Sequence, residues 1–169
     1  MKTRLIALAA ALALPLAACG GNAPESVTEA DADPGTLSGA IPADSQFAAA
    51  MEAAGLANLF DGPEPYTVLL PPDSAFPETL PEDAEAVAEI VTLHILPGTI
   101  LAEDLVAALD QNDGSVSLPS YGGANLDVLR DGDAIRVSVG GNSVTLTPGE
   151  AELEDGAVHS IDGLLQPPA

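Results

Sequence analysis

Positive charge is scarce in this chain. Against 26 acidic residues it has only four lysines and arginines, and two of these, Lys2 and Arg4, stand at the extreme N-terminus. Arg130 and Arg136 are the only cations of the remaining sequence. Proteins that bind nucleic acids need clustered Lys and Arg to neutralise phosphates, so the sequence argues against a nucleic-acid partner. The acidic surface indicates solubility in a salty exterior, and loose divalent-cation binding is the alternative interpretation.

Cysteine and aromatic residues are also rare. Cys19 is the only cysteine, so no disulfide can form within the chain. The two histidines and the scattered acids lack the spacing of a zinc site, and no calcium loop or phosphate loop is present. We therefore expect neither a metal nor a cofactor. With only 3% aromatic residues, the core must consist of Leu, Val, Ile and Ala. The few large core side chains are expected to be Phe47, Phe60, Phe76, Tyr66 and Tyr121.

The N-terminus, "MKTRLIALAAALALPLAACGG", carries two positive charges followed by an apolar run from Leu5 to Ala18. This run is too short to span a bilayer as a helix and is typical of a signal peptide. The segment resembles a bacterial lipoprotein signal, with "LAAC" as its lipobox. The resemblance implies that residues 1–18 are removed and that Cys19 is acylated, which would anchor the chain to a membrane.

The segment that follows the cysteine, residues 19–35, is rich in Pro, Gly, acidic and small residues. This composition buries almost nothing and predicts a disordered acidic tether. Gly20 and Gly21, rather than Asp, follow the cysteine, which by resemblance implies the outer membrane. We therefore expect a lipid-anchored protein of the cell envelope, facing the periplasm or the cell surface, whose folded domain covers residues 36–169.

The first half of the folded part combines helical spacings with short apolar runs. Apolar residues at helical spacing predict helices over 45–60, 81–90 and 101–109. Continuous apolar runs at 66–70 and 90–96 predict buried strands. The second half reads differently, because its apolar and polar residues alternate.

The stretch "LDVLRDGDAIRVSVGGNSVTLT" alternates across two turn signals and predicts an antiparallel meander. The last stretch, "AELEDGAVHSIDGLLQP", predicts one or two closing strands. Helices therefore come first and an antiparallel sheet follows, which places the chain in the α+β class.

Polar residues and glycine mark the ends of the predicted helices. Asp44 or Ser45 is expected to cap the helix that follows it, and Gly55 to end or break that helix. Asp73 stands in "PPDSAF" at the position expected for a helix N-cap, with its carboxylate placed to accept a backbone N–H.

Three stretches carry a family resemblance: "YTVLLPPDSAF", "TLHILPGTI" and "DGAVHSIDGLLQP". In order and spacing they are similar to the characteristic stretches of fasciclin-type domains, and the match runs from about Thr36 to Pro167. The resemblance implies a wedge of two steeply packed, mainly antiparallel sheets with several short helices along one edge. The residues that carry the family motifs are Thr67, Asp73, Phe76, His94, Pro97, Gly98, His159, Asp162 and Gly163.

His94 stands where the family usually has a Tyr-His pair, here Leu93-His94. The resemblance implies that this histidine holds the first motif to the strand, with Asp73 as its hydrogen-bond partner. A buried histidine with a carboxylate partner is more often structural than catalytic.

The stretch "VHSIDG" holds His159, Ser160 and Asp162, which are the residue types of a hydrolytic triad. Neighbouring side chains of a strand point to opposite faces, so His159 cannot act as a base for Ser160. Gly156 and Gly163 are typical of turns that bound a strand. The pattern therefore favours a strand end and no catalytic residue.

The leading hypothesis is a non-enzymatic adhesion or binding module on a lipid anchor at Cys19. Its partner would be an envelope or extracellular protein or a polysaccharide. One alternative is a small envelope hydrolase that uses His94, Asp73 or Asp162 as acid–base groups. The other alternative is an acidic cation-binding surface protein.

Overall fold

All the strands described by this computed structural model, which covers residues 35–149 and 152–168, belong to one hydrogen-bonded sheet. The strands are β1 Tyr66–Leu70, β2 Ile95–Pro97, β3 Ser115–Pro119, β4 Asn125–Asp131, β5 Ala134–Val139, β6 Asn142–Thr147, β7 Glu152–Leu153 and β8 Gly156–Ile161. Their order in the sheet is β2-β1-β8-β6-β5-β4-β3, and β7 is attached to β8. The predicted signal peptide, Cys19 and nearly all of the tether lie outside the described residues.

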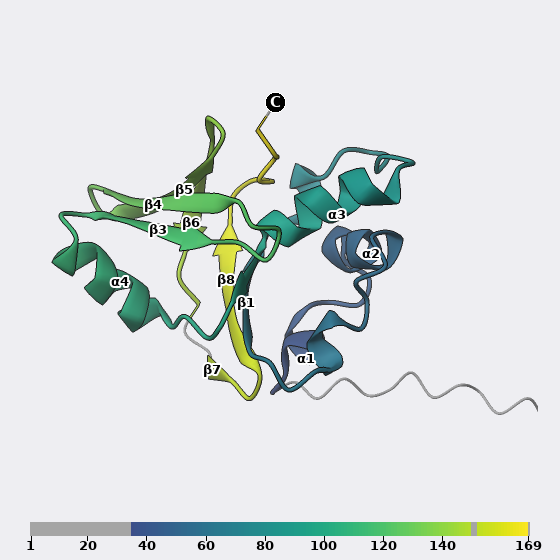
Figure 1. Cartoon of the computed structure of the whole chain (residues 1–169), viewed down its shortest axis with the longest axis horizontal. Helices are drawn as coiled ribbons and strands as arrows, with labels where there is room; N and C mark the ends of the chain where they lie inside the picture. The colour runs from purple at the N-terminus through teal and green to yellow at the C-terminus, as the bar shows by residue number, and fades with distance from the viewer. Residues whose placement is uncertain (1–34, 150–151, 169) are drawn as a thin grey trace, which may run out of the picture. The chain divides into compact units, whose positions relative to one another are not determined.

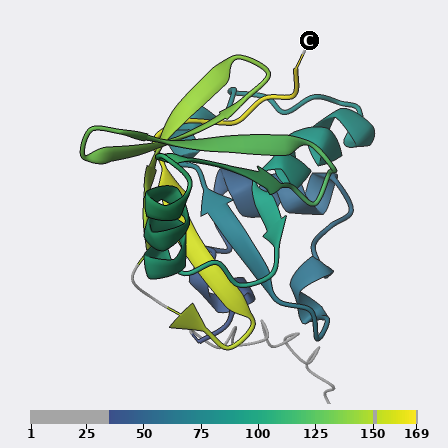
Figure 2. The ribbon, with the colours of Figure 1, turned by 60° about the vertical axis from the view of Figure 1, so that its left-hand side comes forward.

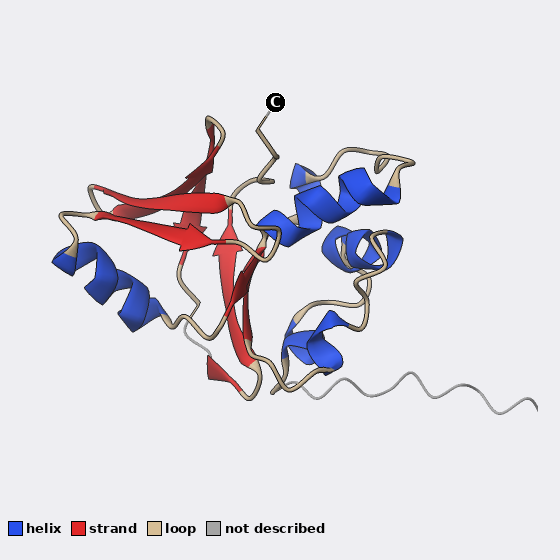
Figure 3. Ribbon diagram, viewed as in Figure 1, coloured by secondary structure: helices blue, strands red, loops and turns tan. Residues whose placement is uncertain are grey.

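The helices are α1 Leu37–Ala40, α2 Gln46–Ala53, α3 Ala84–Leu93 and α4 Ala102–Gln111, with short 3-10 turns at η1 Leu59–Asp61 and η2 Asp73–Ala75. In the described part of the chain the helices all precede β3, and β3 to β8 then follow one another (Figure 3), which agrees with the α+β class. The meander β4-β5-β6 and the closing strands β7 and β8 confirm the sequence-based prediction for the second half.

The last strand lies in the middle of the sheet. β8 pairs in parallel with β1, from Tyr66 opposite Gly156 to Leu70 opposite Ser160. Its end pairs antiparallel with β6, where Leu146 lies opposite Ile161. Every other strand pair of the described residues is antiparallel, so the sheet is mainly antiparallel as expected.

The expectation of two separate sheets is corrected by this topology. The hydrogen-bonded ladder runs without interruption from β2 to β3, because β8 joins the β1–β2 pair to the meander. The two ends of the ladder run in different directions, and β3, β4 and β5 cross the direction of β1 and β8 (Figure 1). Strand twist accumulates across a sheet, which lets one sheet present two differently oriented halves.

The helices do not all lie along one edge, which corrects a second expectation. α1, α2 and α3 lie on one side of β1 and β8, whereas α4 lies on the other side, below β3 and β4 (Figures 1 and 2). Each side has its own apolar cluster. Leu105 and Leu109 of α4 pack with Leu126 and Val137 of the meander, while Phe47 of α2 belongs to the cluster under α1 and α3.

Local signals explain where α2 begins and ends. The hydroxyl of Ser45 accepts a hydrogen bond from the N–H of Ala48 at 3.2 Å, which confirms one of the two predicted caps. Phe47, Ala50 and Met51 form the buried face. Gly55 follows the helix with a φ of +71°, a left-handed conformation that glycine adopts without steric cost.

The stretch 90–96 was predicted as a strand, but most of it is helical. α3 continues to Leu93, and the strand β2 contains only Ile95–Pro97. Val87 and Val91 are one helical turn apart and both are buried against α2, so their packing favours continuing the helix. A continuous apolar run fits a buried helix as well as a strand, so the pattern alone predicted the wrong element for residues 90–93.

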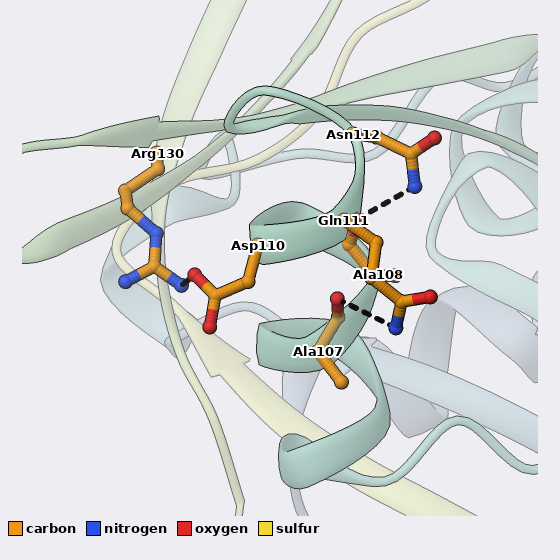
Figure 4. A network of polar contacts seen from close by, with 6 residues as sticks. All are labelled: Ala107, Ala108, Asp110, Gln111, Asn112 and Arg130. Atoms are coloured by element: carbon orange, nitrogen blue, oxygen red, sulfur yellow. Dashed lines mark hydrogen bonds and ion pairs between the residues drawn. The ribbon is translucent and has the colours of Figure 1, made fainter.

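The end of α4 is closed by side-chain amides (Figure 4). Gln111 donates from Nε2 to the carbonyl of Ala107 at 3.1 Å, and Asn112 donates from Nδ2 to the carbonyl of Ala108 at 2.7 Å. Asp110 pairs with Arg130 of β4 at 3.0 Å. The two amides add hydrogen bonds to carbonyls in the last turn of α4, and the ion pair attaches the helix to the meander.

Candidate functional site

His94 caps the C-terminal end of α3 and is fully buried. Its Nδ1 bonds to the carbonyl of Ile90 at 2.8 Å, and its Nε2 accepts the N–H of Leu165 at 3.0 Å. A carbonyl only accepts and an N–H only donates, so the proton must be on Nδ1 and the ring must be neutral. Burial lowers the pKa of His94 to about 4, although the bond to Ile90 opposes this shift.

Asp73 is not the partner of His94, which corrects the expectation from the family resemblance. Both ring nitrogens of His94 are already bonded to backbone groups. Asp73 is exposed, and its Oδ1 accepts the N–H of Gln46, the first residue of α2, at 2.8 Å. The carboxylate therefore does cap a helix, but the helix is one that lies 27 residues earlier in the chain.

His159 is the second buried histidine, and it carries its proton on the opposite nitrogen. Its Nε2 donates to the carbonyl of Ile100 at 2.8 Å, and its Nδ1 accepts the N–H of Gly149 at 2.8 Å. Burial lowers the pKa of His159 as well. Ser160 is exposed on the other face of β8, so the prediction that the two side chains point apart is confirmed.

Thr67 completes a network around the segment that follows β2. Its hydroxyl donates to the carbonyl of Gly98 and accepts the N–H of Ile100, both at 2.8 Å. Because His159 bonds to the carbonyl of Ile100, both backbone groups of this residue are satisfied by buried side chains. Gly98 has a φ of +89° and follows Pro97, which ends β2 opposite Tyr66. These motif residues form one structural cluster.

Asp162 lies just after β8 and bonds to Thr145 of the neighbouring strand β6. Its Oδ1 accepts the N–H of Thr145 at 2.7 Å, and its own N–H donates to the carbonyl of Thr145 at 3.0 Å. The hydrogen bonds from Thr145 lower the pKa of the Asp162 carboxyl. Gly163 lies close to Val144, and Phe76 is half-buried beside the α1–α3 cluster.

The motif residues therefore hold backbone segments together. His94, Asp73 and Asp162 each bond to a different part of the fold, so the geometry assembles no shared acid–base group from them. The lone pair that either histidine would use as a base already accepts a backbone N–H. Within the described ranges, no three His, Cys, Asp or Glu side chains are placed to hold a metal ion.

Sequence reasoning missed an aromatic row that reaches the surface. Phe60, Tyr66 and Tyr121 contact one another edge to face, with ring centroids 5.8 Å apart in both pairs. Phe60 and Tyr66 are buried, but Tyr121 is 45% exposed, which corrects the expectation that it belongs to the core. In the sequence Tyr121 stands in "SYGG", whose serine and glycines are typical of a turn.

Three shallow hollows lie on the described surface. One of about 160 Å³ is lined by Ile41, Met51 and Phe60 near α1 and α2. Another of about 310 Å³ lies over β3 to β5 beside Leu129. The third, of about 270 Å³, borders the Tyr121 loop through Gly122 and also touches Glu89. All three are open grooves, which suit surface contacts rather than an enclosed reaction.

Comparison with known proteins identifies the fold. Residues 42–167 match the family model described as "Fasciclin domain". The chain belongs to the fasciclin family. A solved structure of a domain pair from the insect cell adhesion molecule Fasciclin I resembles this fasciclin chain with a TM-score of 0.54 and 22% identity. That likeness covers 70% of this chain and 43% of the other and concerns the fold.

Sequence relatives come from animals and bacteria. The chain is 33% identical over 126 residues to the transforming growth factor-beta-induced protein ig-h3 of Sus scrofa, with 70% of this chain and 17% of the porcine protein covered. It is 29% identical over 134 residues to protein sll1483 of Synechocystis, with 73% and 67% covered. The chain thus spans about a sixth of the porcine relative. Within residues 35–149 and 152–168, no helix is long and apolar enough to cross a membrane.

Proposed function

We propose that this fasciclin chain is a non-catalytic adhesion or binding module of the cell envelope, held on the membrane by lipid on Cys19. Its partner is a protein or polysaccharide of the envelope or of the surrounding matrix. The outer membrane, facing the periplasm or the cell surface, is the location that the sequence favours. The domain would present its bent sheet, the wedge implied by the family resemblance, at the end of the acidic tether.

One observation carries the non-catalytic part of this proposal. The buried polar side chains that resemble catalytic residues, His94, His159 and Thr67, have their hydrogen-bonding groups engaged by backbone. A general base needs a free lone pair within reach of a substrate. The family adds support, since Fasciclin I is described as a cell adhesion molecule.

The anchor is tested with Cys19→Ser. Loss of the acylated thiol should move the protein from the membrane fraction to the soluble periplasmic fraction, because the described helices do not span a bilayer. A variant that stays in the membrane fraction would refute the lipid anchor.

The binding function is tested by crosslinking on intact cells, followed by identification of the captured molecules. Deletion of the chain should reduce cell aggregation or surface attachment, and the purified chain should restore it. His94→Gln, in a preparation shown to be folded, is the control for catalysis. Hydrolytic activity in the wild type that this folded variant lacks would contradict the proposal.

A further inference from the structure

The surface around Tyr121 is held in a fixed position. The backbone N–H of Tyr121 donates to the carbonyl of Ile95 in β2 at 2.7 Å, and Gly123 donates to Ser120 within the same turn at 2.9 Å. The ring of Tyr121 rests edge to face on Tyr66, which packs on Phe60 in the same way. An exposed aromatic ring with this support keeps one orientation, and little entropy is lost when a ligand covers it.

A carboxylate lies beside this aromatic row. Glu64 accepts a hydrogen bond from the hydroxyl of Tyr66 at 3.2 Å, and its side chain is exposed. Burial raises the pKa of Tyr66, and the bond to Glu64 together with its charge adds to the shift. The surface thus combines a partly exposed aromatic ring, phenol oxygens and a negative charge, and all of these attract cations.

The charge of the molecule favours a cationic ligand here. The chain has 26 acidic residues and only four basic ones. In the described part, Arg130 is paired with Asp110 and Arg136 with Asp131, so the cations on the sheet are engaged by other acids. A neutral sugar could stack on Tyr121, but it would gain nothing from this charge.

We infer that Tyr121, Tyr66 and Glu64 form a docking surface for an arginine or lysine side chain in a basic segment of a partner protein. The cation lies over the Tyr121 ring, and the Glu64 carboxylate receives its N–H groups. The hollow that borders Gly122 and Glu89 accommodates neighbouring residues of the segment. This inference rests on the proposed binding function and names its partner class.

The test uses calorimetry with the full chain and the peptide acetyl-Gly-Arg-Gly-Arg-amide, compared with the same peptide carrying citrulline in place of arginine. Citrulline keeps the shape of arginine but is uncharged. Tyr66 and Tyr121 are the only tyrosines and tryptophan is absent, so tyrosine fluorescence reports on this surface. We expect the arginine peptide to bind, to weaken as salt is raised, and to change the tyrosine emission.

Five variants separate a local site from diffuse charge. Tyr121→Ser and Glu64→Gln should each weaken binding by about three- to tenfold, while Tyr121→Phe, which keeps a ring face, should retain most of it. Leu129→Ser removes the other large apolar side chain that is exposed among the described residues, and Asp127→Asn removes an acid on the same face of β4 as Leu129. These two controls should bind like the wild type.

Several outcomes would overturn the inference. No binding at millimolar peptide, equal binding of the citrulline peptide, or equal weakening by Asp127→Asn and Glu64→Gln would each do so. Tyr121-dependent binding of an uncharged oligosaccharide in place of the peptide would assign the surface to another class of partner. The docking surface and the proposed function can fail independently of each other. Cell aggregation that requires the chain but tolerates Tyr121→Ser and Glu64→Gln would contradict only the docking surface.

Discussion

The ring of His94 and the backbone of Leu165 are joined by a 3.0 Å hydrogen bond across 71 positions of sequence. The same ring bonds to Ile90 in α3 and contacts Phe47 of α2 edge to face, with centroids 6.1 Å apart. A single neutral imidazole thus fixes the C-terminal segment to two helices. The contacts predict what the residue contributes to stability and to its pH dependence.

Replacing His94 with alanine should lower the free energy of unfolding by about 3 kcal/mol. The change leaves the N–H of Leu165 buried without an acceptor and opens a cavity beside Phe47. Urea denaturation measures the loss. The exposed control Thr99→Ala should stay within about 0.5 kcal/mol of the wild type. An unchanged melting temperature for His94→Ala would show that the hydrogen bonds of this ring contribute nothing.

Stability should fall as the pH is lowered from about 6.5 towards 4. The folded pKa of His94 is about 4, below the ordinary 6.5, so in this window the unfolded chain binds a proton that the folded chain rejects. Linkage then removes about 3 kcal/mol of stability, all of which is present above pH 6.5. The lowered pKa of His159 acts in the same direction. Because the chain also carries many acidic residues, the His94 share is obtained by subtracting the profile of His94→Ala. Identical profiles of stability against pH for the wild type and His94→Ala would contradict this prediction.

Asp73→Ala should cost about 1 kcal/mol, because the N–H of Gln46 loses its carboxylate acceptor at the start of α2. Glu78→Ala is the matched control, since it removes an exposed acid from the same loop. Hydrogen exchange should show faster opening of the first turn of α2 in Asp73→Ala and not in the control. Equal exchange in both variants would mean that the carboxylate is dispensable.

Gly156→Ala should prevent or severely weaken folding. A Cβ atom at Gly156 would collide with the carbonyl oxygen of Tyr66, which is backbone of the neighbouring strand β1 and cannot move aside. The cost is about 3 kcal/mol or more. Gly163→Ala is the matched contrast, because its Cβ would lie 3.0 Å from a methyl group of Val144 that can shift. Thermal melts of the two variants decide the matter, and a stable Gly156→Ala would disprove the close approach of β1 and β8.

The sequence predicted most of the meander and the start of α2 because those signals are local. Alternating residues around the "DG" and "GGN" turns are enough to specify β4, β5 and β6. The end of α3 was misread because Val91 and Leu93 fit a buried helix as well as a strand. The four-residue helix α1 was not predicted because it carries too few residues for a pattern. β3 was not predicted as a separate strand, because only Val116 and Leu118 alternate with polar residues before Pro119.

The polar residues of the site were found in the sequence, but their partners were not. Family motifs drew attention to His94, His159 and Thr67, yet each of them bonds to backbone groups that lie far away in the sequence. Backbone groups leave no residue-type signal, so a carboxylate such as Asp73 seemed the natural partner of a histidine. The exposure of Tyr121 also depends on how the loop rests against Ile95, which only the fold determines.

The position of β8 has a consequence for how the chain reaches its fold. Of the described strands this one is synthesised last, yet it joins the β1–β2 pair to the meander. Until it arrives, the nascent polypeptide holds two unconnected halves and no complete core, and its closing contacts are among the most distant in sequence. We expect the incomplete chain to stay open until β8 has been synthesised, because only then can the β1–β2 pair and the meander join into one sheet.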